Sequence, residues 1–195
     1  MPADALPLAR WETFYVIVGS SGGALTGLLF VVVALAADRV RTGVSQGLGA
    51  FTSPSITHFG CVLLVSAIIM MPRDGLSSLG ILLGLCALAG IVVTSMAIRR
   101  IARFELYRPV VEDWVWHGVL PCLSYGALLV AAIILQSATK TALYVVASVT
   151  LMLLFIGIHN AWDAALYSAM YVPREQDSIT PPSPSSAADR ATVTR

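Results

Sequence analysis

The chain has 195 residues, of which 57% are hydrophobic and only 12% are charged, and its net charge is +1 at neutral pH. A soluble domain of ordinary composition carries about 25% charged residues, so this composition excludes that class. The weak net charge argues against nucleic acid as the main partner, because phosphate binding needs a basic face. The sequence therefore predicts an all-α integral membrane protein whose main partner is the lipid bilayer.

Five apolar runs are long enough to be membrane-spanning helices. A helix needs about 20 predominantly apolar residues to cross a hydrocarbon core of about 30 Å. The runs cover residues 14–37, 55–71, 76–98, a stretch from beyond 109 to about 136, and 140–171. We expect a polytopic bundle of five transmembrane helices.

Prolines mark two of these predicted helices. Ser53 and Pro54 precede the second run and are typical of an N-cap followed by proline at the first helical position. The alternative is a start nearer Leu48 with a proline kink. Pro121 lies inside the fourth run, where we expect it to kink the helix.

The basic residues near the helix ends predict the orientation, because cytoplasmic loops carry an excess of Lys and Arg. One set of ends carries seven basic residues and the other carries three. The sets are Arg39, Arg41, Arg99, Arg100, Arg103, Arg108 and Arg174, against Arg10, Arg73 and Lys140. This bias places the N-terminus outside and the C-terminus in the cytoplasm, with the protein in the inner (plasma) membrane of the cell.

The composition changes abruptly at Pro173, where Pro, Ser, Thr and charged residues replace the apolar runs. Such a segment cannot bury enough apolar surface to offset the entropy of ordering. We therefore expect a five-helix membrane bundle over residues 1–172 and a disordered cytoplasmic tail over residues 173–195.

Small residues spaced four apart predict close helix packing, because helix association in lipid depends on close approach of the backbones. The first run carries Gly19, Gly23 and Gly27, and the third carries a comparable face at Ser77, Gly80, Gly84 and Ala87. We expect these faces to pack against other helices of the chain or of a second copy.

The fifth run carries a polar arc. Relative to His159, the side chains of Asp163, Tyr167 and Asn160 project at about 40°, 80° and 100° around a helix. His159 and Asp163 are four residues apart, so the carboxylate can contact and orient the imidazole. Ionisable groups inside a membrane usually face a bundle interior or a water-filled cavity. The sequence therefore predicts a binding site at His159, Asp163, Asn160 and Tyr167.

Two further histidines, His58 and His117, lie toward the same predicted side of the membrane as His159. Imidazoles and a carboxylate suit a transition metal or a proton relay, so His58, His117, His159 and Asp163 are a candidate metal set. A transition metal or haem would be the cofactor. The alternative is that His58 and His117 are interfacial residues, with Trp114 and Trp116 as aromatic-belt anchors.

The sequence leaves three classes of function open. The first is a transporter or channel with a histidine and aspartate site on the cytoplasmic side. The others are an accessory subunit of a membrane complex and a membrane-embedded metal- or haem-dependent enzyme. No HExxH, paired CxxC or phosphate-binding glycine loop is present, so no catalytic residue is assigned and an enzyme is not favoured. We expect a homo-oligomer or a partner membrane subunit.

Overall fold

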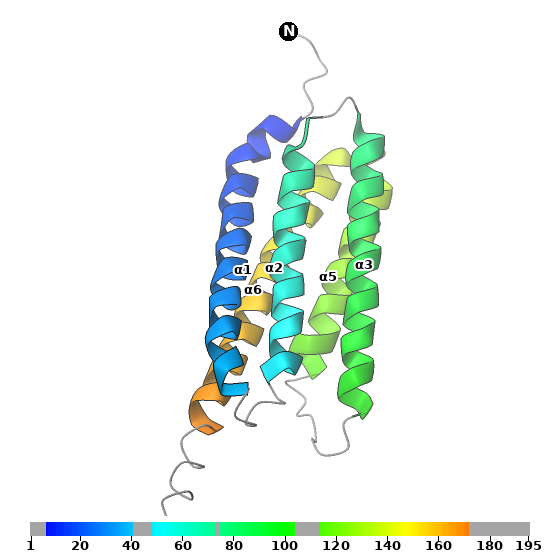
Figure 1. Ribbon diagram of the computed structural model, residues 1–195. Coiled ribbons are helices and arrows are strands. Elements are labelled where there is room, and N and C mark those ends of the chain that lie inside the picture. Colours follow the sequence, from blue (N-terminus) through cyan, green and yellow to red (C-terminus); the bar gives the residue numbers. More distant parts are fainter. Residues whose placement is uncertain (1–6, 41–47, 73–74, 104–113, 172–195) are drawn as a thin grey trace, which may run out of the picture. The chain divides into compact units, whose positions relative to one another are not determined.

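The computed structural model describes residues 7–40, 48–72, 75–103 and 114–171, and these residues form helices without any strand (Figure 1). The predicted all-helical fold is thereby confirmed for this part of the chain. The elements are a 3₁₀ turn η1 (Pro7–Trp11), α1 (Glu12–Val40), α2 (Leu48–Met70), α3 (Leu76–Arg103), a π-helical turn η2 (Val115–Val119), α5 (Leu120–Ile134) and α6 (Thr139–Tyr171).

The chain divides into two compact units, residues 1–164 and residues 165–195. The second contributes only the last turns of α6 to the described residues, so the first holds the helix bundle. The predicted tail over residues 173–195 lies outside the described residues and stays a prediction.

The longer of the two predicted forms of the second helix is the one observed. α2 begins at Leu48, so Pro54 lies in its second turn and not at its first position. At 23 residues, α2 is about 34 Å long at 1.5 Å per residue.

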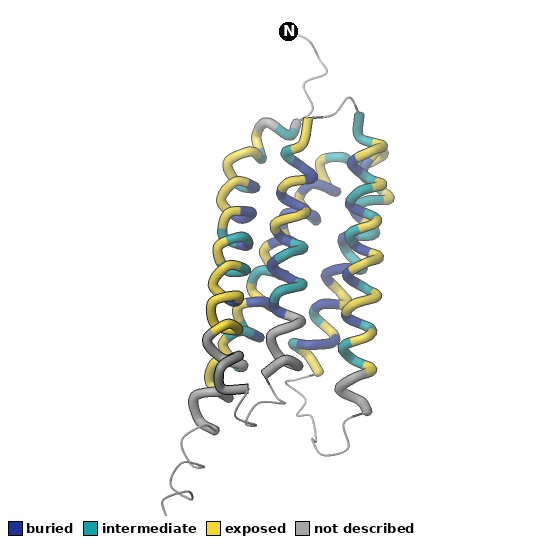
Figure 2. Tube along the Cα trace, in the orientation of Figure 1, coloured by how far each residue is buried: buried dark blue, intermediate teal, exposed yellow. Residues whose placement is uncertain are grey.

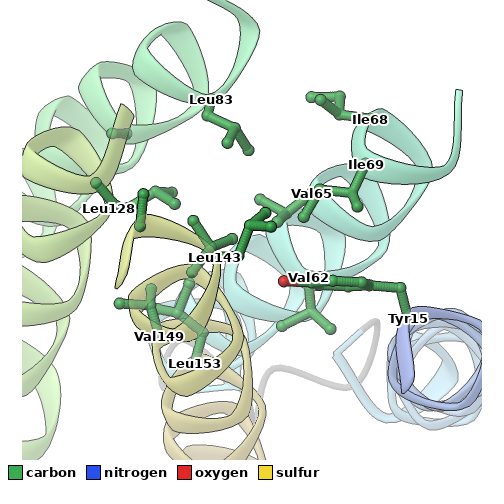
Figure 3. Packing of buried hydrophobic residues seen from close by; sticks show 14 of the residues in the cluster. Tyr15, Val62, Val65, Ile68, Ile69, Leu83, Leu128, Leu143, Val149 and Leu153 are labelled. Atoms are coloured by element: carbon green, nitrogen blue, oxygen red, sulfur yellow. The ribbon is translucent and has the colours of Figure 1, made fainter. Parts of the chain in front are cut away.

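Apolar side chains fill the centre of the bundle and also cover its outside. Figure 3 shows the centre, where Val62, Leu143 and Leu153 are buried and Tyr15 extends inward from α1. Figure 2 shows that buried residues lie on the sides of the helices that face one another. Outward-facing Ile133 and Phe155 are nevertheless 73% and 64% exposed. Soluble monomers rarely expose large apolar patches, so this surface is typical of a membrane protein.

Four of the described helices are long and apolar enough to cross a membrane. These stretches are Glu12–Ala34, Leu76–Arg99, Val115–Ile134 and Thr139–Asp163, and the described residues add a shorter apolar helix, Ser55–Met70.

Within the described part of the chain, the three glycines of the predicted α1 face differ in how closely they pack. A Cβ added to Gly19 would lie 2.7 Å from the Ser66 Cβ of α2, whereas one added to Gly23 would only touch Leu63 at 3.8 Å. At Gly27 nothing described lies within 4 Å of an added Cβ. The prediction is therefore confirmed at Gly19, whereas packing of Gly27 against a second copy stays a prediction. The comparable face of α3 does pack, since Gly80 lies against the backbone of Ala132 in α5.

We expect Gly19→Ala and Gly27→Ala to change stability in opposite directions. At Gly19 the methyl group meets Ser66, and overpacking of this kind costs about 1–3 kcal/mol. At Gly27 the methyl group meets no described atom, and replacing a helix-interior glycine gains about 0.5–1 kcal/mol. Thermal unfolding of both variants in detergent measures the difference. Equal effects at the two positions would show that α1 does not pack on α2 through Gly19.

Candidate functional site

Eight polar side chains are buried among the described residues, and none of them is Asp, Glu, Lys or Arg. They are Ser55, His58, Ser66, Thr94, His117, Ser124, Thr150 and Asn160. Ser66 and Thr150 donate hydrogen bonds to the carbonyl oxygens four residues earlier, Val62 at 2.8 Å and Val146 at 2.6 Å. Such bonds are made within one helix, so these two hydroxyls require no partner from elsewhere.

The π-helical turn η2 places two aromatic side chains of the site. The Leu120 N–H donates to the Val115 carbonyl oxygen, five residues earlier, in place of the usual four. Pro121 follows directly; it has no N–H to donate to the carbonyl of His117, and its ring crowds that carbonyl. The irregularity expected at Pro121 thus takes the form of a π turn. Such turns are frequent at functional sites, and this one carries Trp116 and His117.

His58 and Tyr125 join α2 to α5 in the core. The His58 Nδ1 and the Tyr125 hydroxyl share a hydrogen bond of 3.0 Å, and the tautomer of the imidazole decides which one donates. The Cys61 thiol also interacts with this hydroxyl. His117 lies near enough to His58 for an electrostatic interaction. His58 and His117 are both buried, so neither is the interfacial residue of the alternative interpretation.

Glycine gives the Tyr125 ring its place against α3. A Cβ added to Gly90 would lie 2.2 Å from two carbon atoms of this ring, so only glycine fits there. Tyr125 was missed in the sequence analysis. A neutral side chain in an apolar run gives no charge signal, and its partner His58 lies 67 residues away in sequence.

His159 and Asp163 make the contact that their spacing predicts. The Nδ1 of His159 lies 3.1 Å from the Oδ2 of Asp163. The distance is that of an ion pair, but the atoms are not aligned as a hydrogen bond. Their side chains are 26% and 41% exposed, so the pair lies at the edge of the bundle interior. A binding role for the pair stays a prediction.

Trp116, predicted as a possible membrane-interface anchor, stacks on His159. The ring centroids are 3.8 Å apart and the planes are inclined by 7°. The contact joins η2 to α6, and a protonated imidazole would gain a cation–π interaction with the indole. The described neighbour on the face of the His159 ring is thus Trp116 and not another histidine of the candidate metal set.

Asn160 is the most unusual residue of the polar arc. Its side chain is 0% exposed, and neither its amide nitrogen nor its amide oxygen has a hydrogen-bond partner among the described residues. The Ser55 hydroxyl of α2 is likewise fully buried and has no hydrogen-bond partner among the described residues. The Tyr167 side chain, also predicted in the arc, lies outside the described residues.

The candidate metal set is not supported by the structure. Within the described part of the chain, no three His, Cys, Asp or Glu side chains are grouped so that they could hold a metal ion. His58 is engaged with Tyr125, and His159 lies between Trp116 and Asp163. His58, His117, His159 and Asp163 therefore do not form one ligand shell.

Comparison with known proteins found no matching family model and no significant match among curated proteins or solved structures. The chemistry of the buried polar residues is therefore the basis for a functional proposal.

We expect Gly90→Ala to disturb the His58–Tyr125 contact, with Gly84→Ala as the matched control. At Gly90 the added methyl group would overlap the Tyr125 ring, whereas at Gly84 it would touch only the Ala132 Cβ at an ordinary 3.9 Å. Overpacking at Gly90 should lower the free energy of unfolding by about 1–3 kcal/mol.

Thermal unfolding and the NMR signals of the His58 imidazole measure this effect. Only Gly90→Ala should lower stability and shift the imidazole signals. If both variants leave these signals where they are in the unmodified protein, Tyr125 does not depend on Gly90 for its position.

Proposed function

We propose that the chain is a five-span protein of the inner (plasma) membrane, with its N-terminus outside and its C-terminus in the cytoplasm. Four long apolar helices support this proposal, as does α2, whose 23 residues match the length needed to cross. The excess of arginine at the ends of α1 and α3 supports the orientation.

We further propose that the protein is a small transporter or channel. The observation that carries this proposal is Asn160, which is fully buried and has no described hydrogen-bond partner for either amide atom. Leaving a buried amide unsatisfied costs about 1–3 kcal/mol, and the cost rises in surroundings that exclude water. A residue that served packing alone would be Leu at this position. The amide therefore favours a molecule that enters the bundle and hydrogen-bonds there.

The neighbours of Asn160 support an entrance at the proposed cytoplasmic side. His159 and Asp163 are partly exposed and in contact, and both lie near the end of the apolar stretch Thr139–Asp163. Ionisable groups at such positions usually border a hydrated path. Trp116 holds one face of the imidazole and so limits how His159 can turn.

The proposed topology predicts the behaviour of fusions. A reporter that is active only in the cytoplasm should work when it is fused after Tyr171. A reporter that is active only outside the membrane should work when it is fused after Arg73, in the connection between α2 and α3. An external signal from the fusion at Tyr171 would contradict five spans, and α2 would be the first helix to question because its apolar segment is the shortest.

The transport proposal predicts flux in liposomes that depends on the pair at the entrance. Purified protein should carry at least one of three probes, protons, K⁺ or glycerol, faster than protein-free liposomes. Asp163→Asn and His159→Gln should each slow that flux about tenfold, equivalent to about 1.4 kcal/mol in the barrier. Lys140→Gln, at the exposed start of α6, is the control and should carry the probe normally.

Thermal stability separates a functional pair from a structural one. The two variants should lose flux while they keep their unfolding temperature. A loss of flux in step with a loss of stability would make the pair a structural contact, and no flux of any probe would contradict the transport proposal itself.

A further inference from the structure

Two fully buried polar groups lie at the same depth where α2 meets α6. Phe59 of α2 rests its ring against α6, since a Cβ added to Gly157 would lie 2.5 Å from it. The two helices run in opposite directions (Figure 1). Ser55 lies four residues before Phe59, and Asn160 lies three residues after Gly157, so each is about one helical turn from this contact, toward the same end. Ser55 and Asn160 thus lie in one layer, on adjoining faces.

The polar groups of this layer differ from the other buried hydroxyls of the same two helices. Ser66 and Thr150 are satisfied by carbonyl oxygens of their own helices. The Ser55 hydroxyl and both amide atoms of Asn160 have no partner among the described residues. Together they offer donors and acceptors, because a hydroxyl and an amide each supply both. A ligand that also carries both kinds of group would match them.

The charge of the layer indicates which ligands it can accept. None of the described buried side chains is an acid, a lysine or an arginine, and the nearest acid in sequence, Asp163, is partly exposed. An ion held here would lose its hydration without gaining a fixed counter-charge, which is strongly unfavourable. An uncharged solute loses much less on entry and regains its hydrogen bonds from Ser55 and Asn160.

We propose that Ser55 and Asn160 form a binding site for a small uncharged hydrogen-bonding solute, of the polyol or amide type. The proposal rests on the transport function proposed above and names its substrate class. Phe59 closes the site on the side away from the proposed cytoplasmic entrance, because its ring fills the notch at Gly157. The His159–Asp163 pair lies beside the site toward that entrance.

Light scattering from proteoliposomes under an osmotic gradient tests the proposal, with glycerol and urea as the probes. Both should enter faster than into protein-free liposomes, whereas K⁺ and proton flux should stay at the protein-free level. Asn160→Leu should slow glycerol and urea entry at least tenfold, and Ser55→Ala should slow it severalfold. Thr150→Val is the matched control, since it removes a buried hydroxyl of α6 that is already satisfied, and it should transport normally.

The outcomes separate this inference from the function on which it rests. Ion flux without glycerol or urea flux, or glycerol flux that Asn160→Leu leaves unchanged, would overturn the inference and keep the transport proposal. No flux of any probe would overturn both.

Thermal unfolding of the same variants gives a readout that does not depend on transport. If Asn160 serves a ligand, Asn160→Leu should raise the unfolding temperature without solute, because it removes an unpartnered buried amide. Thr150→Val should not raise it. A fall in unfolding temperature for Asn160→Leu would show that the amide stabilises the fold, and this result would overturn the inference.

Discussion

An apolar helix bundle offers a buried polar side chain very few partners, and this scarcity shapes the interior of the protein. Ser66 and Thr150 find their hydrogen-bond partners locally, in carbonyl oxygens of their own helices. His58 and Tyr125 are hydrogen-bonded to each other across two helices, so their bond also fixes α2 against α5. Ser55 and Asn160 have no hydrogen-bond partner for their side chains among the described residues. That contrast makes these two residues the centre of the functional interpretation.

Glycines decide where the aromatic rings of the site can lie. Gly90 admits the Tyr125 ring and Gly157 admits the Phe59 ring, each at distances that a Cβ atom would prevent. Both rings lie beside polar residues: Tyr125 bonds His58, and Phe59 lies one turn from Ser55. Small residues here therefore do more than bring backbones together. They create notches that hold large rings next to hydrogen-bonding groups.

The helices could be predicted from the sequence because length and hydropathy alone specify them, and the His159–Asp163 contact because its spacing is local. The contacts between helices could not be predicted in this way. Periodicity gives the faces of each helix but not its rotation against a neighbour. The stack of Trp116 on His159 and the pairing of Tyr125 with His58 depend on that rotation. Gly27 shows the same limit, since its spacing matches Gly19 but no described atom lies within 4 Å of a Cβ added at Gly27.

The π turn at Val115–Val119 also bears on how this helix could accommodate one extra residue. A π turn holds one residue more than the α-helical turn that it replaces, and a single inserted codon in an ordinary helix produces one. In an unbroken α-helix, which turns by about 100° per residue, an insertion would re-aim every side chain on one side of it, but a π turn absorbs the extra residue, so that the helix beyond the turn keeps its facing. Trp116 and His117 lie within the turn, whereas Tyr125 lies in the regular helix beyond it. One insertion would thus have changed the direction of the first two relative to Tyr125, leaving the α3–α5 packing intact.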